Sequence, residues 1–281
     1  MTGIYWKKFY VLNVRAFLCI TLLVPLYNQA QKNEPSKEWR KIQSIPISSE
    51  VDAWFTDLQQ TLYLVNKDEI TKIGSPFNTV QSIKSWQSID GIEPINPFKL
   101  LLFSASQQQI CIADNTLALT GDCFPLEALE IANVTAISSS KRPDMFWIYD
   151  EVNSTILLYN YLTKTIVQSL YNFKGLLGLK GKITLKENET GLWVISDRNE
   201  IVLLDDYLNK VYTFQLAFDH AVPYKNGILY SDQNTLYFTN RYDGSKAVHK
   251  ISTQETIKKI HVSGNQLYIE LDQRIDVFII P

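Results

Sequence analysis

Aspartate is the residue whose spacing in this chain most readily suggests chemistry. One aspartate follows a short apolar segment in each of five stretches, at Asp57, Asp150, Asp197, Asp232 and Asp272. In a ring fold that gathers equivalent positions, such carboxylates could bind Ca²⁺ or act as general acids and bases. Aspartate also accepts hydrogen bonds from nearby backbone in hairpin turns. A ring needs the turn in every repeat but a site only once, so the recurrence favours the turn interpretation.

Histidine offers less material for a site. His220, His249 and His261 show none of the close pair spacings typical of zinc ligands, and the chain contains no GxSxG segment for a serine hydrolase. Because His220 follows Asp219, a role facing a central channel and a plain polar loop role both stay open. We therefore assign no catalytic residue, no metal ligand and no cofactor.

Three glycines before a lysine superficially resemble a phosphate-binding loop. Such a loop needs four residues between its glycines and a Ser or Thr after the lysine. Here five residues separate Gly175 from Gly181, with Gly178 between them, and Ile183 follows Lys182. We interpret the segment as a connection between repeats.

Two cysteines flank an expected hairpin, in which residues 110–114 pair with residues 118–122 around a turn near Asn115. This pairing makes Cys123 a diagonal neighbour of Cys111. A disulfide between them would add about 3 kcal/mol of stability in the chain-entropy model. The alternative is two free thiols packed as small apolar side chains, and the sequence leaves both open.

The first thirty residues have the order of a secretory signal peptide. Three basic residues and no acidic residue precede the apolar segment 16–27, at Lys7, Lys8 and Arg15. Small and polar residues follow at 28–31, where a signal peptidase could cut. A membrane anchor would need roughly 20 apolar residues. We predict cleavage after residues 1–30, with a periplasmic, cell-surface or secreted protein and no transmembrane segment left; an uncleaved anchor is the alternative.

Composition limits the class of protein. Of 281 residues, 46% are hydrophobic and 12% aromatic, which excludes a disordered or collagen-like chain. With 27 basic and 29 acidic residues the formal charge is −2, and without residues 1–30 it becomes −5. Nucleic acid is therefore not an expected partner. Residues 31–37 are interpreted as a flexible tether, and residues 38–281 as one domain.

One pattern recurs six times: a short aromatic-rich strand, a polar turn and a second apolar strand. Taking Leu62, Ile110, Ile156, Ile201, Leu236 and Ile275 as equivalent gives spacings of 48, 46, 45, 35 and 39 residues. Repeats of about 40 to 50 residues built from short strands are typical of β-propellers. We predict an all-β fold, a single β-propeller with six four-stranded blades.

Further strands complete the predicted blades. In the third repeat residues 134–138 are the expected inner strand and 164–169 the outer strand, and in the fourth repeat 182–186 and 210–215 take these places. The chain ends on the second strand of its sixth copy. The extended segment 39–47 then supplies the missing outer strand, so that an N-terminal strand closes the ring without a long unpaired edge.

Tryptophan suggests two different surfaces. Trp54, Trp147 and Trp193 occupy one position of the repeat, where they form either a stacking surface for a sugar or base, or packing between blades. Large rings fill the wedge between blades well, which favours packing. Trp86 lies outside the pattern in a polar stretch, KSWQ, and is our candidate for a partner-binding surface.

The succession of short strands with Asp or Asn at the hairpins resembles the WD40, YVTN and NHL class of repeat propellers. Residues 96–103 (NPFKLLLF) and 114–117 (DNTL) also resemble stretches of exported bacterial propeller proteins. Trp-Asp dipeptides, kelch double glycines and Asp-boxes are absent from the sequence. The resemblance therefore implies a fold and an exported setting, and it carries over no active site.

Three functions are compatible with these residues. The first is an exported, non-enzymatic propeller that binds a protein or glycan of the cell envelope as a scaffold. The second is an enzyme at the channel mouth, a lyase or hydrolase acting on a sugar or lactone. The third is a structural subunit of an envelope assembly. The side chains that line the central channel discriminate between them.

Overall fold

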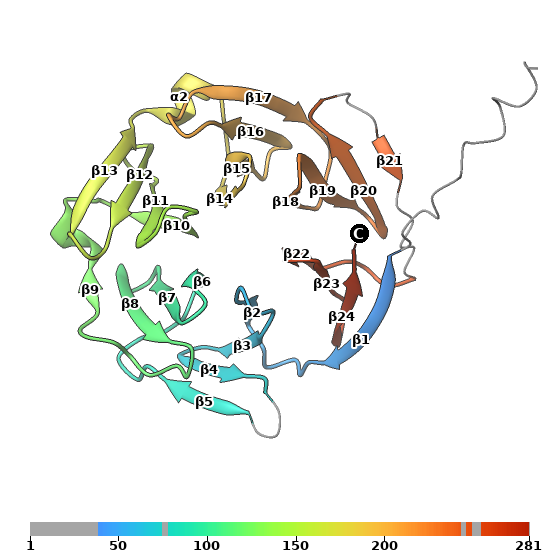
Figure 1. Ribbon diagram of the computed structural model, residues 1–281, viewed down its shortest axis with the longest axis horizontal. Coiled ribbons are helices and arrows are strands. Elements are labelled where there is room, and N and C mark those ends of the chain that lie inside the picture. The colour runs from blue at the N-terminus through green and yellow to red at the C-terminus, as the bar shows by residue number, and fades with distance from the viewer. Residues whose placement is uncertain (1–38, 75–77, 243–245, 249–253, 281) are drawn as a thin grey trace, which may run out of the picture. The chain divides into compact units, whose positions relative to one another are not determined.

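The computed structural model describes residues 39–74, 78–242, 246–248 and 254–280. Within them, twenty-four strands form six four-stranded antiparallel sheets that stand as blades around a ring (Figure 1). The fold is a six-bladed β-propeller, as predicted. Residues 40–280 form one compact unit. The predicted signal peptide and tether, residues 1–37, lie outside the described residues.

The first three blades follow one another along the chain, and each runs from its innermost to its outermost strand. The first blade contains β2 (Ala53–Thr56), β3 (Leu62–Asn66), β4 (Glu69–Lys72) and β5 (Thr79–Ser82). The second contains β6 (Gly91–Asn96), β7 (Lys99–Ser104), β8 (Gln109–Asp114) and β9 (Phe124–Pro125). The third contains β10 (Val134–Ser139), β11 (Met145–Asp150), β12 (Thr155–Asn160) and β13 (Thr165–Leu170).

The remaining blades complete the ring. The fourth contains β14 (Ile183–Asn188), β15 (Gly191–Ser196), β16 (Glu200–Leu204) and β17 (Lys210–Gln215). The fifth contains β18 (His220–Tyr224), β19 (Gly227–Asp232), β20 (Thr235–Asn240) and β21 (Lys246–Val248). The sixth contains β22 (Lys259–Ser263), β23 (Gln266–Glu270), β24 (Arg274–Ile279) and the N-terminal β1 (Arg40–Pro46). Two short helices, η2 (Leu126–Leu129) and α2 (Phe173–Leu177), lie in connections between blades. Among the described residues, no helix has the length and apolar character needed to cross a membrane.

The ring closes through strand β1, as predicted. It pairs antiparallel with β24, from Arg40 opposite Ile279 to Pro46 opposite Arg274. Side chains reinforce this pairing at Asp276, whose carboxylate accepts hydrogen bonds from Ser44 Oγ at 2.6 Å and Lys41 Nζ at 2.8 Å. The two ends of the domain are thereby joined in one sheet, in which β1 covers the edge of β24.

The core lies between the blades. The second strand of the fourth blade, β15, is buried at every residue, whereas the outer strand β13 begins with three exposed residues. A middle strand is covered on both faces because each blade packs between two others, and this geometry favours long apolar segments without alternation. One core cluster joins Leu158 of the third blade to Val194 of the fourth. The aromatic excess of the composition therefore serves packing between sheets.

The turns of the blades define two opposite rims. Because the four strands of a blade alternate in direction, the turns after its first and third strands lie on one side, which we call rim 1. The turns after its second strand and the connections to the next blade lie on the other side, which we call rim 2. Side-chain contacts agree with this division: Gln60, after β2, donates to Asn265 Oδ1, after β22, at 3.1 Å.

The repeat alignment is wrong by one strand in the first blade. Leu62 lies on the second strand, β3, whereas its assumed equivalents, such as Ile110 on β8, lie on third strands. The true third strand is β4, which has four residues and buries only Ile70 fully. Strand β4 was missed because its apolar pattern is weak. The alignment was also misled because the WFTD segment at β2 is similar to the WIYD segment at β11. The spacing from Ile70 to Ile110 is 40 residues, which fits the other repeats better.

Candidate functional site

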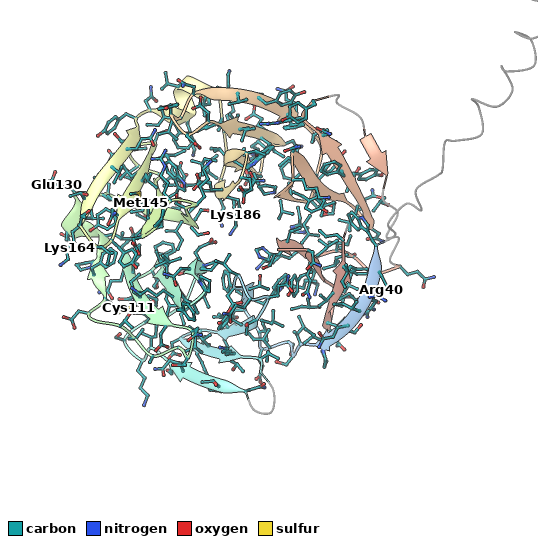
Figure 2. The ribbon with its side chains drawn as sticks, viewed as in Figure 1. Arg40, Cys111, Glu130, Met145, Lys164 and Lys186 are labelled. Carbon is teal, nitrogen blue, oxygen red and sulfur yellow. A yellow bond between two sulfur atoms is a disulfide. The ribbon has the colours of Figure 1, made fainter. Side chains whose placement is uncertain are left out.

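The innermost strands β2, β6, β10, β14, β18 and β22 face the centre of the ring (Figure 1). Charged and titratable side chains from three of them approach one another there: Glu93 on β6, Lys186 on β14, and Lys259 and His261 on β22. Figure 2 shows Lys186 extending from its blade into the central space. We call Glu93, Lys186, Lys259 and His261 the channel cluster.

Glu93 connects three blades. Its carboxylate forms an ion pair with Lys186 of the fourth blade. It also accepts hydrogen bonds from the backbone N of Ser139, at 3.1 Å, and from the Ser139 hydroxyl, at 3.2 Å, in the third blade. Glu93 is only 7% exposed, and a buried carboxylate needs such partners to remain charged without a large desolvation cost.

Lys259 connects the sixth blade to the first. Its Nζ donates to the backbone oxygen of Trp54 at 2.6 Å and lies 4.3 Å from the centre of the Trp54 ring. The Trp54 indole N–H in turn donates to Glu270 Oε2 at 2.6 Å. The pKa of Lys259 is lowered to about 8, mainly by burial and also by the positive charge of Lys186, while Glu270 and Glu93 act in the opposite direction.

The described histidines are neutral at pH 7. Burial lowers the pKa of His261 well below its usual value, and the charges of Lys186 and Lys259 act in the same direction. Burial also lowers the pKa of His220, which begins β18. His249 lies outside the described residues. In the part of the chain that the structure describes, no group of three or more His, Cys, Asp or Glu side chains is placed to hold a metal ion.

The contacts of the channel cluster join blades to one another. Glu93 and Lys186 bridge the second, third and fourth blades, and Lys259 bridges the sixth and first. Such buried charged networks specify one arrangement of the elements they connect, because a wrong arrangement leaves a charge unpaired. The geometry therefore favours a role in holding the ring together.

The recurring aspartates belong to turns. Asp57 Oδ1 accepts from the backbone N–H of Gln59, at 2.9 Å, and of Thr61, at 2.8 Å. Asp150 accepts from four backbone N–H groups, those of Ala132, Asn133, Val152 and Asn153. These contacts confirm the turn interpretation for both residues. Asp57 follows a first strand and lies on rim 1, whereas Asp150 is the last residue of a second strand and lies at rim 2, so the two are not equivalent.

The three repeat tryptophans pack between blades, as expected. Trp54, Trp147 and Trp193 are each at most 1% exposed, and Trp193 packs against Ile228 and Tyr230 of the next blade. Trp54 lies on the innermost strand, while the other two lie on second strands. The assumed equivalence of Trp54 therefore fails together with the alignment of the first repeat.

Trp86 is wrongly predicted as a partner-binding surface. Its side chain is only 4% exposed and belongs to a core cluster with Ile83 and Ile89. Its indole N–H donates to Gln109 Oε1 at 3.0 Å. The polar neighbours that suggested exposure belong to the connection between the first and second blades, and the indole itself packs into the core cluster that these two blades share.

Cys111 and Cys123 are joined as a disulfide in the structure, with their Cα atoms 4.2 Å apart. The hairpin begins as expected, with Ala113 opposite Leu119. That register would place Gly121 opposite Cys111. Ile110 lies instead opposite Phe124, so the register shifts by two residues near Gly121. The shift makes the cysteines direct neighbours where a diagonal pair was expected.

The glycine-rich segment connects two blades, as interpreted from the sequence. It contains helix α2 and runs from β13 to β14. Gly178 and Gly181 have positive φ values of 74° and 75°, a conformation that glycine adopts without strain. A Cβ atom on Gly181 would lie 2.0 Å from Asp197 Oδ1, so any other residue there would displace this side chain of the β15–β16 turn.

Sequence reasoning missed a pocket between the second and third blades. Its volume is about 660 Å³. The lining combines apolar, aromatic and charged side chains: Lys99, Ile112, Thr120, Asp122, Cys123, Phe124, Pro125, Ala128, Leu129, Tyr159, Tyr161, Leu162 and Lys164. Figure 2 places Lys164 at the outer side of the ring. The residues that line the pocket come from separate repeats. The sequence feature that pointed to it was the unusually long stretch between β8 and the third blade.

Exposed large apolar side chains are more numerous on rim 1 than on rim 2. Among the described residues, six large hydrophobic side chains are exposed on its turns: Leu58, Phe98, Leu119, Leu162, Tyr207 and Tyr242. The most exposed is Tyr207, at 82%. Rim 2 carries three, which are Val152, Tyr171 and Leu176.

Solved structures share this fold at low sequence identity. The WD40 domain of Neurospora crassa Pan2 is 10% identical, with a TM-score of 0.57 and coverage of 88% of this chain and 96% of that chain. BBS1N in complex with ARL6DN is 12% identical, with a TM-score of 0.57 and coverage of 86% and 97%. BamB from Moraxella catarrhalis is 10% identical, with a TM-score of 0.52 and coverage of 86% and 97%. No protein-family model and no curated protein matches this sequence. The similarity shows the propeller fold alone.

Proposed function

We propose that this protein is an exported, non-enzymatic β-propeller that binds another protein of the cell envelope through rim 1. The observation that carries the proposal is the concentration of exposed large apolar side chains on that rim. Three of them are aromatic, Phe98, Tyr207 and Tyr242. Aromatic side chains are enriched at protein interfaces, and gathered apolar exposure marks interaction surfaces.

Other observations support parts of this proposal. The charged groups of the channel cluster are engaged with neighbouring blades, which leaves the rims as the surfaces offered to a partner. A structural neighbour, BBS1N, was solved in complex with ARL6DN. The disulfide between Cys111 and Cys123 fits an oxidising compartment, and residues 1–30 have the order of a signal peptide.

A photo-cross-linking experiment tests the role of rim 1. A benzoyl-phenylalanine replaces Tyr207 on rim 1 or, as matched control, Tyr171 on rim 2, which is also an exposed tyrosine. We expect irradiation of intact cells to attach one discrete protein to the Tyr207 variant alone. Cross-linking from Tyr171 alone, or from neither position, contradicts the proposal.

The captured protein then permits a quantitative test. We expect the double variant Phe98→Ser and Tyr207→Ser to bind the purified partner at least about tenfold more weakly, because it removes two aromatic contacts. The matched variant Val152→Ser and Tyr171→Ser on rim 2 should bind as the wild type does. Equal affinities for both double variants would rule out rim 1 as the interface.

A further inference from the structure

The second blade has an incomplete outer strand. Strand β9 contains two residues, whereas β13 and β17 in the following blades contain six each. An outer strand covers the wide end of the wedge between neighbouring blades. In the second blade the pairing with β8 is interrupted between Leu119, opposite Ala113, and Phe124, opposite Ile110, and the Cys111–Cys123 bridge holds the chain beside β8 after this interruption. The wedge towards the third blade therefore stays open as the pocket.

The walls of this pocket are apolar and aromatic. Ile112 and Phe124 come from the second blade, Leu129 from η2, and Tyr159 and Tyr161 from the third blade. The rings of Phe124 and Tyr159 lie 6.0 Å apart. A volume of about 660 Å³ is within the range of about 300 to 1,000 Å³ in which proteins hold small molecules.

Tyr159 brings a hydroxyl without a protein partner to this pocket. The residue is only 3% exposed, and Phe146 packs edge-on against its ring at 5.5 Å. Among the described residues no group forms a hydrogen bond with its hydroxyl, and the hydroxyl oxygen is not one of the fully buried polar atoms. Burial raises the pKa of Tyr159, so the group stays protonated at neutral pH and is available as a donor.

The charges on the lining favour an anion. Lys99 and Lys164 are cations, and Asp122 is the one carboxylate of the lining. Among the described residues neither lysine forms an ion pair. Lys99 Nζ lies 3.3 Å from the hydroxyl of Tyr161, which donates to Asp144 Oδ1 at 2.9 Å. The Lys99 ammonium therefore keeps N–H groups for a further acceptor.

We propose that this pocket binds a small aromatic carboxylate. Its ring lies among Phe124, Tyr159 and Tyr161, and its carboxylate accepts hydrogen bonds from the lysines and from the Tyr159 hydroxyl. The pocket shares Leu162 with rim 1, but the ring and carboxylate contacts proposed here involve none of the rim 1 side chains, so ligand binding is tested independently of the proposed function.

Binding is tested on the purified, oxidised mature protein. Saturation-transfer NMR and calorimetry compare 3-phenylpropionate and 2-naphthoate with 3-phenylpropanamide, which keeps the ring but has no charge. We expect both carboxylates to bind with one site per chain and the amide to bind at least about tenfold more weakly, because hydrogen bonds to a charged group are lost. Absence of carboxylate binding at millimolar concentration, or equal binding of the amide, overturns the proposal.

Three variants locate the site. Tyr159→Phe removes only the hydroxyl and should weaken 3-phenylpropionate binding about fivefold, since one hydrogen bond is lost. Lys164→Gln should weaken it about tenfold. The control Lys210→Gln changes an exposed lysine of β17, outside the pocket, and should bind as the wild type does. The melting temperature of Tyr159→Phe verifies its fold. Wild-type affinity in Tyr159→Phe and Lys164→Gln, or equal loss in Lys210→Gln, contradicts this location.

Discussion

Lys259 illustrates how the fold changes the chemistry of one residue. Because burial and Lys186 lower its pKa to about 8, we expect its amine to titrate well before other lysines. Reductive ¹³C-methylation followed by NMR resolves each dimethyl-lysine signal. We expect one signal to titrate near pH 8 and to be absent in Lys259→Met. A lysine spectrum in which every signal titrates above pH 10 contradicts the environment described here.

The lowered pKa of Lys259 also makes the stability of the protein depend on pH. Its pKa in the folded protein, about 8, is lower than the ordinary lysine value of 10.5, so between these pH values the unfolded chain binds more protons. The contribution of Lys259 to the free energy of unfolding therefore rises with pH across this window and is constant below it. Lys259→Met should show a smaller slope than the wild type in urea unfolding between pH 8 and 10.

Trp86 gives a second prediction at this scale. Because it is buried in a core cluster, Trp86→Ala should lower the free energy of unfolding by about 3–5 kcal/mol. The control Tyr207→Ala removes an 82% exposed ring and should change it by less than about 0.5 kcal/mol. Urea unfolding measures both. If Trp86→Ala lowers the free energy of unfolding by less than about 1 kcal/mol, Trp86 is not buried in the core.

At the scale of elements, the closing strand β1 depends on Asp276. Burial raises the pKa of this carboxyl, but hydrogen bonds from Lys41 and Ser44 and the charge of Arg274 outweigh burial and lower it overall. The ionised group therefore stabilises the fold above its unfolded pKa of about 3.9, and this contribution is lost as pH falls through the lower folded value.

Asp276→Asn tests this closure. It should lower the free energy of unfolding at pH 7 by about 2 kcal/mol, since hydrogen bonds to a buried charge are lost. The difference from the wild type should shrink below about pH 4. Thermal unfolding from pH 2 to 7 measures it, with the exposed Asp272→Asn as control. A difference that does not vary with pH contradicts the assignment to ionised Asp276.

The Cys111–Cys123 disulfide should be detectable by thiol titration and should contribute to stability. Thiol titration of the unreduced, denatured mature protein should detect no free thiol. Reduction should lower the free energy of unfolding by about 3 kcal/mol, because the unfolded chain regains the freedom of the closed loop. The variant with both cysteines changed to Ser, which has no bridge to reduce, should be unaffected by reductant. Two reactive thiols in the unreduced protein would rule the bridge out.

The elements also show where sequence reasoning reached its limit. Inner and outer strands of the third and fourth blades were predicted within one or two residues, because each is rich in the β-branched residues Val, Ile and Thr, which favour strands even where they are exposed. Strand β4 was missed because it buries only Ile70 fully. Its identity as a third strand comes from pairing on both sides, with β3 and β5, which no local pattern records.

At the scale of the whole molecule, export is the untested prediction. We expect protein isolated from its natural host to begin near Gln31, because signal peptidase removes residues 1–30. N-terminal sequencing and intact mass determine this start. Replacement of Leu22 by Arg within the apolar segment should leave the chain unprocessed in the cytoplasm, while Leu58→Arg on rim 1 should not affect processing. Protein that retains Met1 in the envelope would instead indicate an uncleaved anchor.

The sequence by itself determined the class of fold, the number of blades and the closing strand, because repeated apolar segments at a nearly constant spacing are a local property of the chain. It also assigned Asp57 and Asp150 to turns. The tertiary structure alone decided which side chains meet across blades. Glu93 and Lys186 are far apart in sequence, and Tyr159 faces a pocket that exists only because β9 is short. Closure of a ring brings such distant positions together, and their contacts depend on register and strand length beyond the reach of local patterns.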